Sequence, residues 1–445
     1  MTTHPSHNID FKKYHRLLDR LNPIRVHGKV SEIIGLVVEG HGPVASLGEL
    51  CAIYPAGEGR PVTAEVVGFK KGKVLLMPLD SLQGLGPGCK IISLGKQASV
   101  GVGDGFLGRV IDGLGHPIDD KGAIEYDDAY PIYADPINPL KRGRIDAPMD
   151  LGIKAINGVL TCGKGQRMGI FAGSGVGKSV LMGMIARNTK ADINVIGLIG
   201  ERGREVREFL EKNLGLEGLK RSVVVVAASD RHPLIRMRAA YVATTISEYF
   251  RDQGKNVLLM LDSLTRFAMA QREIGLSIGE PPTTKGYTPS VFSLLPKLLE
   301  RSGLDAGKGS ITGLYTILVE GDDFNEPIAD AARSILDGHI SLTRELANKN
   351  HYPAIDILQS ISRVMIDVVD EEQKKKANEV QNILATYKKA EDLINIGAYV
   401  QGSNPDIDYA IAMIAKVNAF LEQGINEQVD FLNTKKQLLS LFTES

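Results

Sequence analysis

The segment Ala172-Gly173-Ser174-Gly175-Val176-Gly177-Lys178-Ser179 decides the fold class of this 445-residue chain. An apolar run, Met168 to Ala172, precedes it, and a run with helical character, Val180 to Arg187, follows it. A glycine-rich turn between a strand and a helix directs backbone amides and a helix N-terminus at phosphate oxygens. The segment therefore predicts a phosphate-binding loop, although Ala172 stands where the strict pattern has glycine. The alternative is a glycine-rich turn that ends in a surface lysine.

Each residue of this loop has an expected role in binding ATP and Mg²⁺. Lys178 would neutralise the β- and γ-phosphates, and Ser179 would ligate the metal. The glycines would let the backbone amides converge on the phosphate oxygens. The predicted nucleotide-binding residues here are Gly173, Ser174, Gly175, Val176, Gly177, Lys178, Ser179 and Val180.

Outward from the loop, apolar β-branched runs alternate with amphipathic segments of helix length from about Leu151 onward. Runs that are apolar throughout are typical of strands covered on both faces, which predicts a parallel α/β sheet. Ligands bind such sheets at the carboxyl ends of the strands. The expected strands are Met168 to Ala172, Ile193 to Ile199, Val223 to Ala228, Val257 to Leu261 and Ile311 to Val319.

Two acidic residues follow strands of this predicted sheet. Asp262 ends the Val257 to Leu261 run, where it would hold hydrated Mg²⁺ or, alternatively, cap the next helix. Glu201 follows the Ile193 to Ile199 run, where it would activate the attacking water or, alternatively, pair with a nearby arginine. Both carboxylates are expected at the edge that carries the phosphate loop.

An arginine is also expected near the γ-phosphoryl group, where charge develops during hydrolysis. Such an arginine often comes from a neighbouring subunit and contributes ~10³ to 10⁵ in rate. Arg333, Arg344 and Arg363 are all candidates, and neither composition nor spacing selects one of them.

The flanking regions have different patterns. Residues 9 to 21 predict a short amphipathic helix that either packs on the body or awaits a partner. Short β-rich runs separated by glycines predict a small closed barrel, and residues 101–135 are turn-rich and predict a connector. The expected barrel strands are Val26 to Val30, Ile33 to Glu39, Cys51 to Tyr54, Val62 to Phe69, Lys73 to Pro78 and Cys89 to Ser93.

After about Val364 the pattern is helical, with Glu371 to Leu393 and Asp406 to Gln423 the clearest segments and a break at Gly397 to Pro405. The fold class expected is therefore α/β, a phosphate-loop parallel-sheet core with an N-terminal β-barrel and a C-terminal helical domain. The predicted boundaries are residues 1–22 for the amphipathic segment, 23–96 for the barrel, 97–364 for the ATPase domain with its connector, and 365–445 for the helical domain.

Composition excludes several classes of protein. With 43% hydrophobic and 24% charged residues, the chain is not mainly disordered. Its 52 Lys and Arg against 53 Asp and Glu argue against a protein that coats nucleic acid non-specifically. Three scattered cysteines favour a reducing compartment, and the nine histidines form no zinc-binding spacing. Neither a secretory signal nor an apolar run of ~18 residues is found, which predicts a cytoplasmic protein with only peripheral membrane contact.

Several motifs together make the chain similar to a known family from about Ile24 onward. The chain resembles the hexameric rotary ATPases and, among them, the type III protein-export ATPases, with a preference for the flagellar branch. The motifs are GFLGRVIDGLG (105–115), the phosphate loop, GERGREV (200–206), LDSLTRFA (261–268), GEPPTTKGYTPSVF (279–292), VEGDD (319–323), DAAR (330–333), YPAID (352–356) and SISR (360–363).

The resemblance implies roles for individual residues. Arg363 matches the arginine that acts on a neighbouring subunit's nucleotide, and Tyr352 matches an aromatic that stacks on adenine. From the sequence pattern alone, Tyr352 could equally be a core residue. The catalytic residues expected are Lys178, Glu201, Arg202 and Arg363, and the metal-binding residues expected are Ser179 and Asp262.

The resemblance also implies a homohexamer whose barrels form a ring, with a stalk-like protein in its pore. Other implied partners are a regulator on the N-terminal segment, export chaperone–substrate complexes and a membrane export gate, with the protein peripheral to the inner membrane and no nucleic acid bound. The leading hypothesis is a Mg²⁺-dependent ATPase for flagellar protein export. The alternatives are an injectisome export ATPase, a catalytic subunit of an ion-translocating ATPase, an RNA-translocating ring and a nucleotide-binding scaffold without turnover.

Overall fold

The computed structural model describes residues 11, 26–57, 59–319, 321, 323 and 326–442. The chain divides into two compact units, Met1–Ala98 and Ser99–Ser445. The amphipathic helix predicted over residues 9 to 21 falls outside the described residues except for Phe11, so it stays a prediction. Within the described ranges, every helix is too short or too polar to cross a lipid bilayer.

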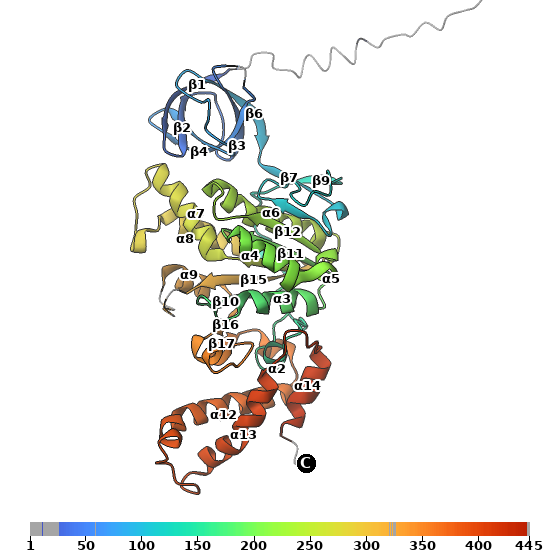
Figure 1. The fold of residues 1–445 in the computed structure, drawn as a ribbon. Coiled ribbons are helices and arrows are strands. Elements are labelled where there is room, and N and C mark those ends of the chain that lie inside the picture. Colours follow the sequence, from blue (N-terminus) through green and yellow to red (C-terminus); the bar gives the residue numbers. More distant parts are fainter. Residues whose placement is uncertain are drawn as a thin grey trace, which may run out of the picture. The chain divides into compact units, whose positions relative to one another are not determined.

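The first unit is the predicted closed barrel (Figure 1). Its strands follow the order β1-β2-β5-β4-β3-β6 around the barrel, and Val38, Ile53 and Leu76 are among the side chains that fill its interior. The expected strand Ile33 to Glu39 is wrong, because Gly35 adopts a positive φ of 57° and turns the chain there. The barrel strands are β1 (Gly28–Ile34), β2 (Val37–His41), β3 (Glu49–Tyr54), β4 (Val62–Lys70), β5 (Lys73–Pro78) and β6 (Lys90–Gln97).

The second unit is built on the predicted parallel sheet. Among the described residues the sheet has nine strands, in the order β17-β16-β10-β15-β13-β11-β12-β8, with the short β14 beside β15. Only β14 and β17 run antiparallel to their neighbours. The strands are β8 (Val110–Asp112), β10 (Arg167–Ala172), β11 (Ile193–Ile199), β12 (Ser222–Ala227), β13 (Asn256–Asp262), β14 (Gly303–Leu304), β15 (Ser310–Leu318), β16 (Gly338–Leu342) and β17 (Ile355–Ser362).

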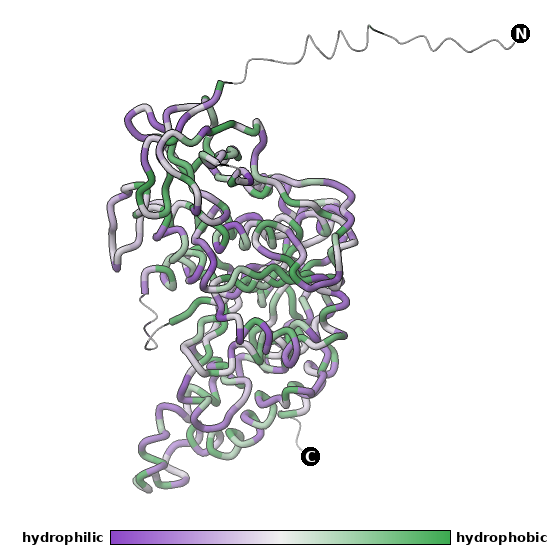
Figure 2. The backbone as a smooth tube through the Cα atoms, turned by 45° about the horizontal axis from the view of Figure 1, so that its top comes forward, coloured by the Kyte–Doolittle hydropathy of each residue, from purple (hydrophilic) through white to green (hydrophobic). Residues whose placement is uncertain are grey.

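Helices cover both faces of this sheet, which explains why its strands are apolar throughout. Ile196 and Leu198 of β11 share a core with α3 (Lys178–Asn188). A Cβ on the intervening Gly197 would instead lie 3.4 Å from Ala243 of α6 (Pro233–Asp252), on the other face. Figure 2 shows the strands of the sheet as a green, hydrophobic centre in this unit. The other α- and π-helices described before residue 370 of this unit are α2 (Lys154–Val159), α4 (Gly203–Glu208), the π-helix η3 (Phe209–Leu214), α5 (Gly215–Lys220), α7 (Leu264–Ser277), α8 (Pro289–Leu299), α9 (Pro327–Ile335), α10 (Arg344–Asn348) and α11 (Met365–Val368).

The region predicted as a connector, residues 101–135, contains more structure than expected. Within it, β8 pairs parallel with β12 and so belongs to the central sheet. Two further strands, β7 (Ser99–Val102) and β9 (Asp128–Pro131), form a small antiparallel pair. These strands were missed because runs of three or four residues are too short to produce a periodic signal.

The chain ends in helices α12 (Glu371–Asn395), α13 (Pro405–Leu421) and α14 (Phe431–Ser440). The side chains of Asp370, Asn404 and Asp430 cap their N-termini by accepting backbone N–H groups. The predicted break between the first two helices is present, and α14 was not predicted. These helices pack on α2, where the Gln373 amide donates to the carbonyl of Asn157 at 3.0 Å.

Candidate active site

The phosphate loop leaves the carboxyl end of β10, as predicted. Gly175 and Gly177 have φ values of 81° and 89°, a region that only glycine adopts without strain, so both glycines are needed for the turn. Lys178 then begins α3. The loop borders a cavity of about 500 Å³, which Glu201, Arg202, Arg266 and Arg344 also line.

Three predicted residues from separate strands meet at this edge of the sheet. The Lys178 ammonium donates to Oδ1 of Asp262 and lies 3.6 Å from Oε1 of Glu201. Asp262 ends β13, and Glu201 follows β11. The hydroxyl of Thr316, on the intervening β15, donates to the same Asp262 oxygen at 2.6 Å. Thr316 was not predicted, because a threonine inside an apolar strand carries no local signal for a site.

Burial and neighbouring charges shift the pKa values of Glu201 and Lys178. Burial and the neighbouring Asp262 carboxylate raise the pKa of Glu201 to about 7. Burial opposes the charged form of Lys178, but the two carboxylates outweigh it and raise the pKa of this ammonium. Lys178 is therefore a fixed cation, whereas Glu201 can hold or release a proton near neutral pH. A carboxylate with that pKa suits general-base chemistry.

The residues present fit a magnesium ion held partly by nucleotide phosphates. Mg²⁺ usually takes one or two carboxylates and keeps several waters. Ser179 and Asp262 line one small cavity with Glu201, whose buried Oε1 accepts no hydrogen bond from the described residues. No group of three or more His, Cys, Asp or Glu in the described part of the chain could hold a metal by itself. An ion at this site would be held by Ser179 and Asp262 and would take its other ligands from the nucleotide and water.

A second cavity of about 400 Å³ is also lined by residues of the loop, and we refer to it as the base pocket, after the nucleotide base that Tyr352 is expected to stack on. Tyr352 lies in this pocket with 42% of its surface exposed, and a Cβ on Gly177 would lie 3.6 Å from its ring. The partial exposure argues against a core role for this aromatic. The pocket is lined by Gly175, Val176, Gly177, Val180, Leu181, Met184, Leu342, Tyr352, Pro353, Ala354, Gln423, Gly424 and Ile425.

The arginines differ in position. Arg344 lies nearest the loop, and its guanidinium donates to the carbonyl of Ser174 at 3.5 Å. Arg202 lines the cavity and forms an exposed pair with Glu205 at 3.3 Å. Arg333 lies on α9. The half-buried Arg266 on α7 lines the cavity, although it was not predicted as a site residue.

Arg363 and the phosphate loop of its own chain lie at opposite ends of the strands. Its predecessor, Ser362, pairs with Gly338 at the start of β16, and β16 runs parallel to β10. The loop instead follows the far end of β10, where Ala172 pairs with Leu342. Four residues of strand separate these two positions, about 13 Å at ~3.3 Å per residue. Arg363 accordingly does not line either cavity of its own chain.

Comparisons with protein families cover most of the chain. The "ATP synthase alpha/beta family, nucleotide-binding domain" matches residues 152–362, and the beta-barrel domain of the same family matches residues 30–95. The "T3SS EscN ATPase C-terminal domain" matches residues 369–440. Together these matches follow the barrel, the sheet and the last helices.

Individual proteins match over nearly their full lengths. The chain is 55% identical to a "Flagellum-specific ATP synthase" of Bacillus subtilis, over 90% of this chain and 92% of the relative. It is 51% identical to a "Type 3 secretion system ATPase" of Xanthomonas euvesicatoria, over 94% of each. The assembled ATPase EscN of enteropathogenic E. coli matches with a TM-score of 0.88 and 48% identity, over 93% of this chain and 99% of that one. EscN bound to its central stalk EscO matches with a TM-score of 0.85, 48% identity and the same coverage of each chain.

Proposed function

The chain belongs to the ATP synthase alpha/beta family, and from this membership we propose that it is the Mg²⁺-dependent ATPase of a flagellar type III export apparatus. It hydrolyses ATP at the subunit interfaces of a homohexameric ring. The observation that carries this proposal is the meeting of Lys178, Asp262 and Glu201 at the carboxyl ends of β10, β13 and β11. This arrangement supplies a phosphate-binding cation, a metal-binding carboxylate and a general base at the same ends of the strands.

Nucleotide binding exchanges the partners of Lys178. In the structure, its ammonium pairs with Asp262 and Glu201. The β- and γ-phosphates would take the place of these carboxylates, and Asp262 and Ser179 would then hold the metal. A bound Mg²⁺ would supply positive charge that offsets the charge of the phosphates.

Glu201 then acts on the attacking water. Its pKa of about 7 leaves a substantial fraction ionised at neutral pH. The ionised carboxylate accepts a proton from water as the oxygen attacks the γ-phosphorus. Arg202 lines the same cavity and adds positive charge beside this reaction.

Arg363 supplies the remaining positive charge to a neighbouring subunit's nucleotide. Its position at the edge of the sheet opposite its own phosphate loop supports this assignment. Each chain has both the loop and the arginine, so every interface of a closed ring of identical subunits would be complete. Such a ring differs from one in which catalytic and non-catalytic subunits alternate.

The proposed partners follow from family membership. A ring is supported by the assembled state of EscN, and a stalk-like protein in the pore by the complex of EscN with its central stalk EscO. A regulator on the N-terminal segment, export chaperone–substrate complexes and a peripheral membrane export gate complete the proposal, with the ATPase on the cytoplasmic side of the inner membrane.

The decisive experiment is Glu201→Gln in the full chain. Glutamine keeps the size of the side chain but cannot act as a general base. We therefore expect ATP binding to persist and turnover to fall at least about a hundredfold. Glu217→Gln is the matched control, because Glu217 is exposed on α5 and pairs with Lys220 there. Normal turnover in the Glu201 variant would show that Glu201 is not the general base.

The injectisome alternative is separated by a different measurement, because relatives of both kinds match this chain at 55% and 51% identity. The gene is expressed in a host that lacks only its flagellar export ATPase. Recovered motility, and its loss with Glu201→Gln, supports the flagellar assignment. Recovered secretion through an injectisome without motility contradicts it.

A further inference from the structure

The segment that follows α13, residues 422–427, reaches back to the base pocket, and we call it the strap. Gln423, Gly424 and Ile425 of the strap line this pocket together with Tyr352. The strap follows the last turn of α13, so one wall of the pocket comes from the helical end of the chain. The position of this wall depends on what holds the strap in place.

Gln423 holds the strap to two other segments of the chain. Its backbone N–H donates to the carbonyl of Tyr352 at 2.9 Å. Its side-chain Nε2 donates to the carbonyl of Gly152 at 2.9 Å and to that of Glu427 at 3.0 Å. Its Oε1 accepts the backbone N–H of Lys154 at 2.8 Å. Only 5% of the residue is exposed, so these bonds form away from water.

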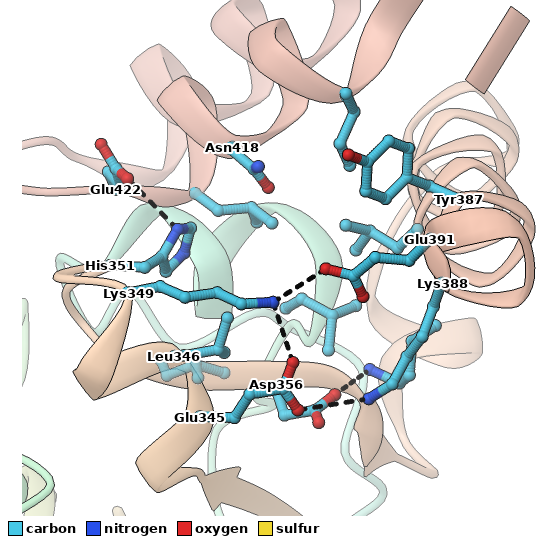
Figure 3. A pocket seen from close by; sticks show the side chains of 16 residues that line it. Glu345, Leu346, Lys349, His351, Asp356, Tyr387, Lys388, Glu391, Asn418 and Glu422 are labelled. Carbon is cyan, nitrogen blue, oxygen red and sulfur yellow. Dashed lines mark hydrogen bonds and ion pairs between the residues drawn. The ribbon is translucent and has the colours of Figure 1, made fainter. Parts of the chain in front are cut away.

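Neighbouring contacts fix the strap on both sides of Gln423. On one side, Glu422 lies 3.2 Å from the ring of His351, the residue before Tyr352, and Figure 3 shows these two side chains facing each other. On the other side, the carbonyl of Ile425 accepts a hydrogen bond from Arg187 of α3 at 2.9 Å. The strap therefore joins the aromatic loop to the helix that begins in the phosphate loop.

We propose that Gln423 is the positioning residue of the base pocket: its buried amide seats the strap so that Ile425 and Tyr352 form the walls between which the nucleotide base binds. Every polar atom of this amide already has a backbone partner, so Gln423 acts through the strap rather than on the base. The inference rests on the proposed ATPase function and adds a residue to its nucleotide site.

The geometry separates two parts of ATP affinity. The triphosphate binds the phosphate loop and Lys178, which Gln423 does not contact. The nucleotide base binds the pocket that Gln423 shapes. Loss of the amide should therefore weaken ATP binding without affecting ligands that consist only of phosphates.

The test uses Gln423→Met in the full chain, because methionine keeps the side-chain length and loses the hydrogen bonds. We expect the KM for ATP to rise about tenfold, the effect of losing roughly one buried hydrogen bond, while kcat changes less than about threefold. The inhibition constant of inorganic tripolyphosphate should stay at its wild-type value. Gln423→Glu keeps the acceptor for Lys154 but turns a carboxylate oxygen toward the carbonyls of Gly152 and Glu427, so it should raise KM at least as much.

Gln373→Met is the matched control. Gln373 is also a buried glutamine whose amide bonds backbone carbonyls, those of Asn157 at 3.0 Å and Gly158 at 3.3 Å, but it lies outside the base pocket. This variant should lose stability without a change in the KM for ATP. A rise in KM equal to that of Gln423→Met would show a general packing effect and overturn the proposal.

A double-mutant cycle with Ile425→Ala tests the route of the effect. If Gln423 acts by seating Ile425, the combined variant should raise KM less than the product of the two single changes. Independent, multiplicative changes overturn the proposal.

A second variant serves if Gln423→Met fails to fold. Glu427→Ala loosens the same strap from a more exposed position, because the Glu427 carboxylate accepts the Gly424 N–H at 3.0 Å. An unchanged KM in that variant also overturns the proposal. If the wild-type chain neither binds nor hydrolyses ATP, the proposed function fails instead.

Discussion

Arg363 and Lys178 lie at opposite ends of the strands of one sheet. Lys178 begins the helix after β10, and Arg363 follows β17, whose last residue pairs with the first residue of β16. Because β16 and β10 run parallel, the arginine is at their amino-terminal ends and the lysine beyond their carboxyl ends. In the proposed mechanism, a nucleotide held by Lys178 would therefore receive Arg363 from another subunit.

This separation predicts complementation between two inactive variants. Lys178→Ala loses the phosphate cation but keeps Arg363, and Arg363→Ala keeps an intact phosphate loop. Each variant alone should lose nearly all turnover. In rings assembled from an equal mixture, about a quarter of the interfaces would combine an intact loop with an intact arginine if subunits mix at random. ATPase activity should recover toward that fraction.

The control is co-assembly itself, which mass measurement of differently tagged subunits establishes. Recovery should disappear below the concentration at which rings form. If mixed rings form and stay inactive, Arg363 does not act on the neighbouring site, and the interface mechanism is wrong.

The sequence was most informative where the signal is local. The phosphate loop, Glu201 and Asp262 each stand directly after an apolar strand, and apolar strands covered on both faces are easy to recognise. Parallel pairing then brings their carboxyl ends together without further information. The same reasoning correctly predicted a barrel from short runs between glycines.

Other parts of the site depend on contacts that no local pattern records. Gln423 and Ile425 line the base pocket although they are about 70 positions after Tyr352 in the chain. Thr316 is hidden inside an apolar strand, and only the sheet order β15-β13 brings it to Asp262. The role proposed for Arg363 rests on family resemblance, because spacing alone does not separate it from Arg344, which the fold places at the phosphate loop.

Thr316 should influence metal binding through Asp262. Thr316→Val removes the hydroxyl that donates to Asp262 Oδ1 at 2.6 Å and keeps the side-chain shape. Outer-shell partners of metal ligands typically change metal affinity 10–100-fold, so we expect the Mg²⁺ concentration for half-maximal ATPase activity to rise about tenfold.

The control is Thr312→Val on the same strand. Thr312 is equally buried, and its hydroxyl accepts the Gly165 N–H at 2.9 Å, away from the site. Titration of turnover against free Mg²⁺ should leave this control at the wild-type midpoint. The prediction fails if both threonine variants shift the midpoint equally.

The pKa of Glu201 predicts the acid side of the pH profile. Burial and Asp262 raise this pKa to about 7, and the adjacent Glu205 adds to the increase. The base must be ionised, so kcat/KM should rise as pH increases through about 7. Glu205→Gln removes the adjacent carboxyl and should move this limb of the profile to lower pH. Glu211→Gln, an exposed carboxylate paired with Arg207, should leave it in place, and an unmoved limb in the Glu205 variant contradicts the assigned pKa.

Arg301 should be among the residues on which stability depends most. The residue is 1% exposed, and its guanidinium donates to both carboxylate oxygens of Glu248, to the carbonyl of Ile132 and to the hydroxyl of Thr245. Arg301→Met leaves Glu248 charged and buried without its partner, which typically costs about 3–5 kcal/mol in the free energy of unfolding. Denaturant titration of the full chain measures this loss.

A second substitution separates the charge from the packing. In Arg301→Met with Glu248→Met, no unpaired charge remains, so a large part of the lost stability should return. Arg207→Met removes an arginine from an exposed pair with Glu211 at 2.8 Å, and its cost should stay below about 1 kcal/mol. If the double variant is as unstable as the single one, the loss comes from packing around Arg301 and not from the stranded carboxylate. Recovery would instead show that the pair stabilises the fold mainly because neither charge is left alone in the interior.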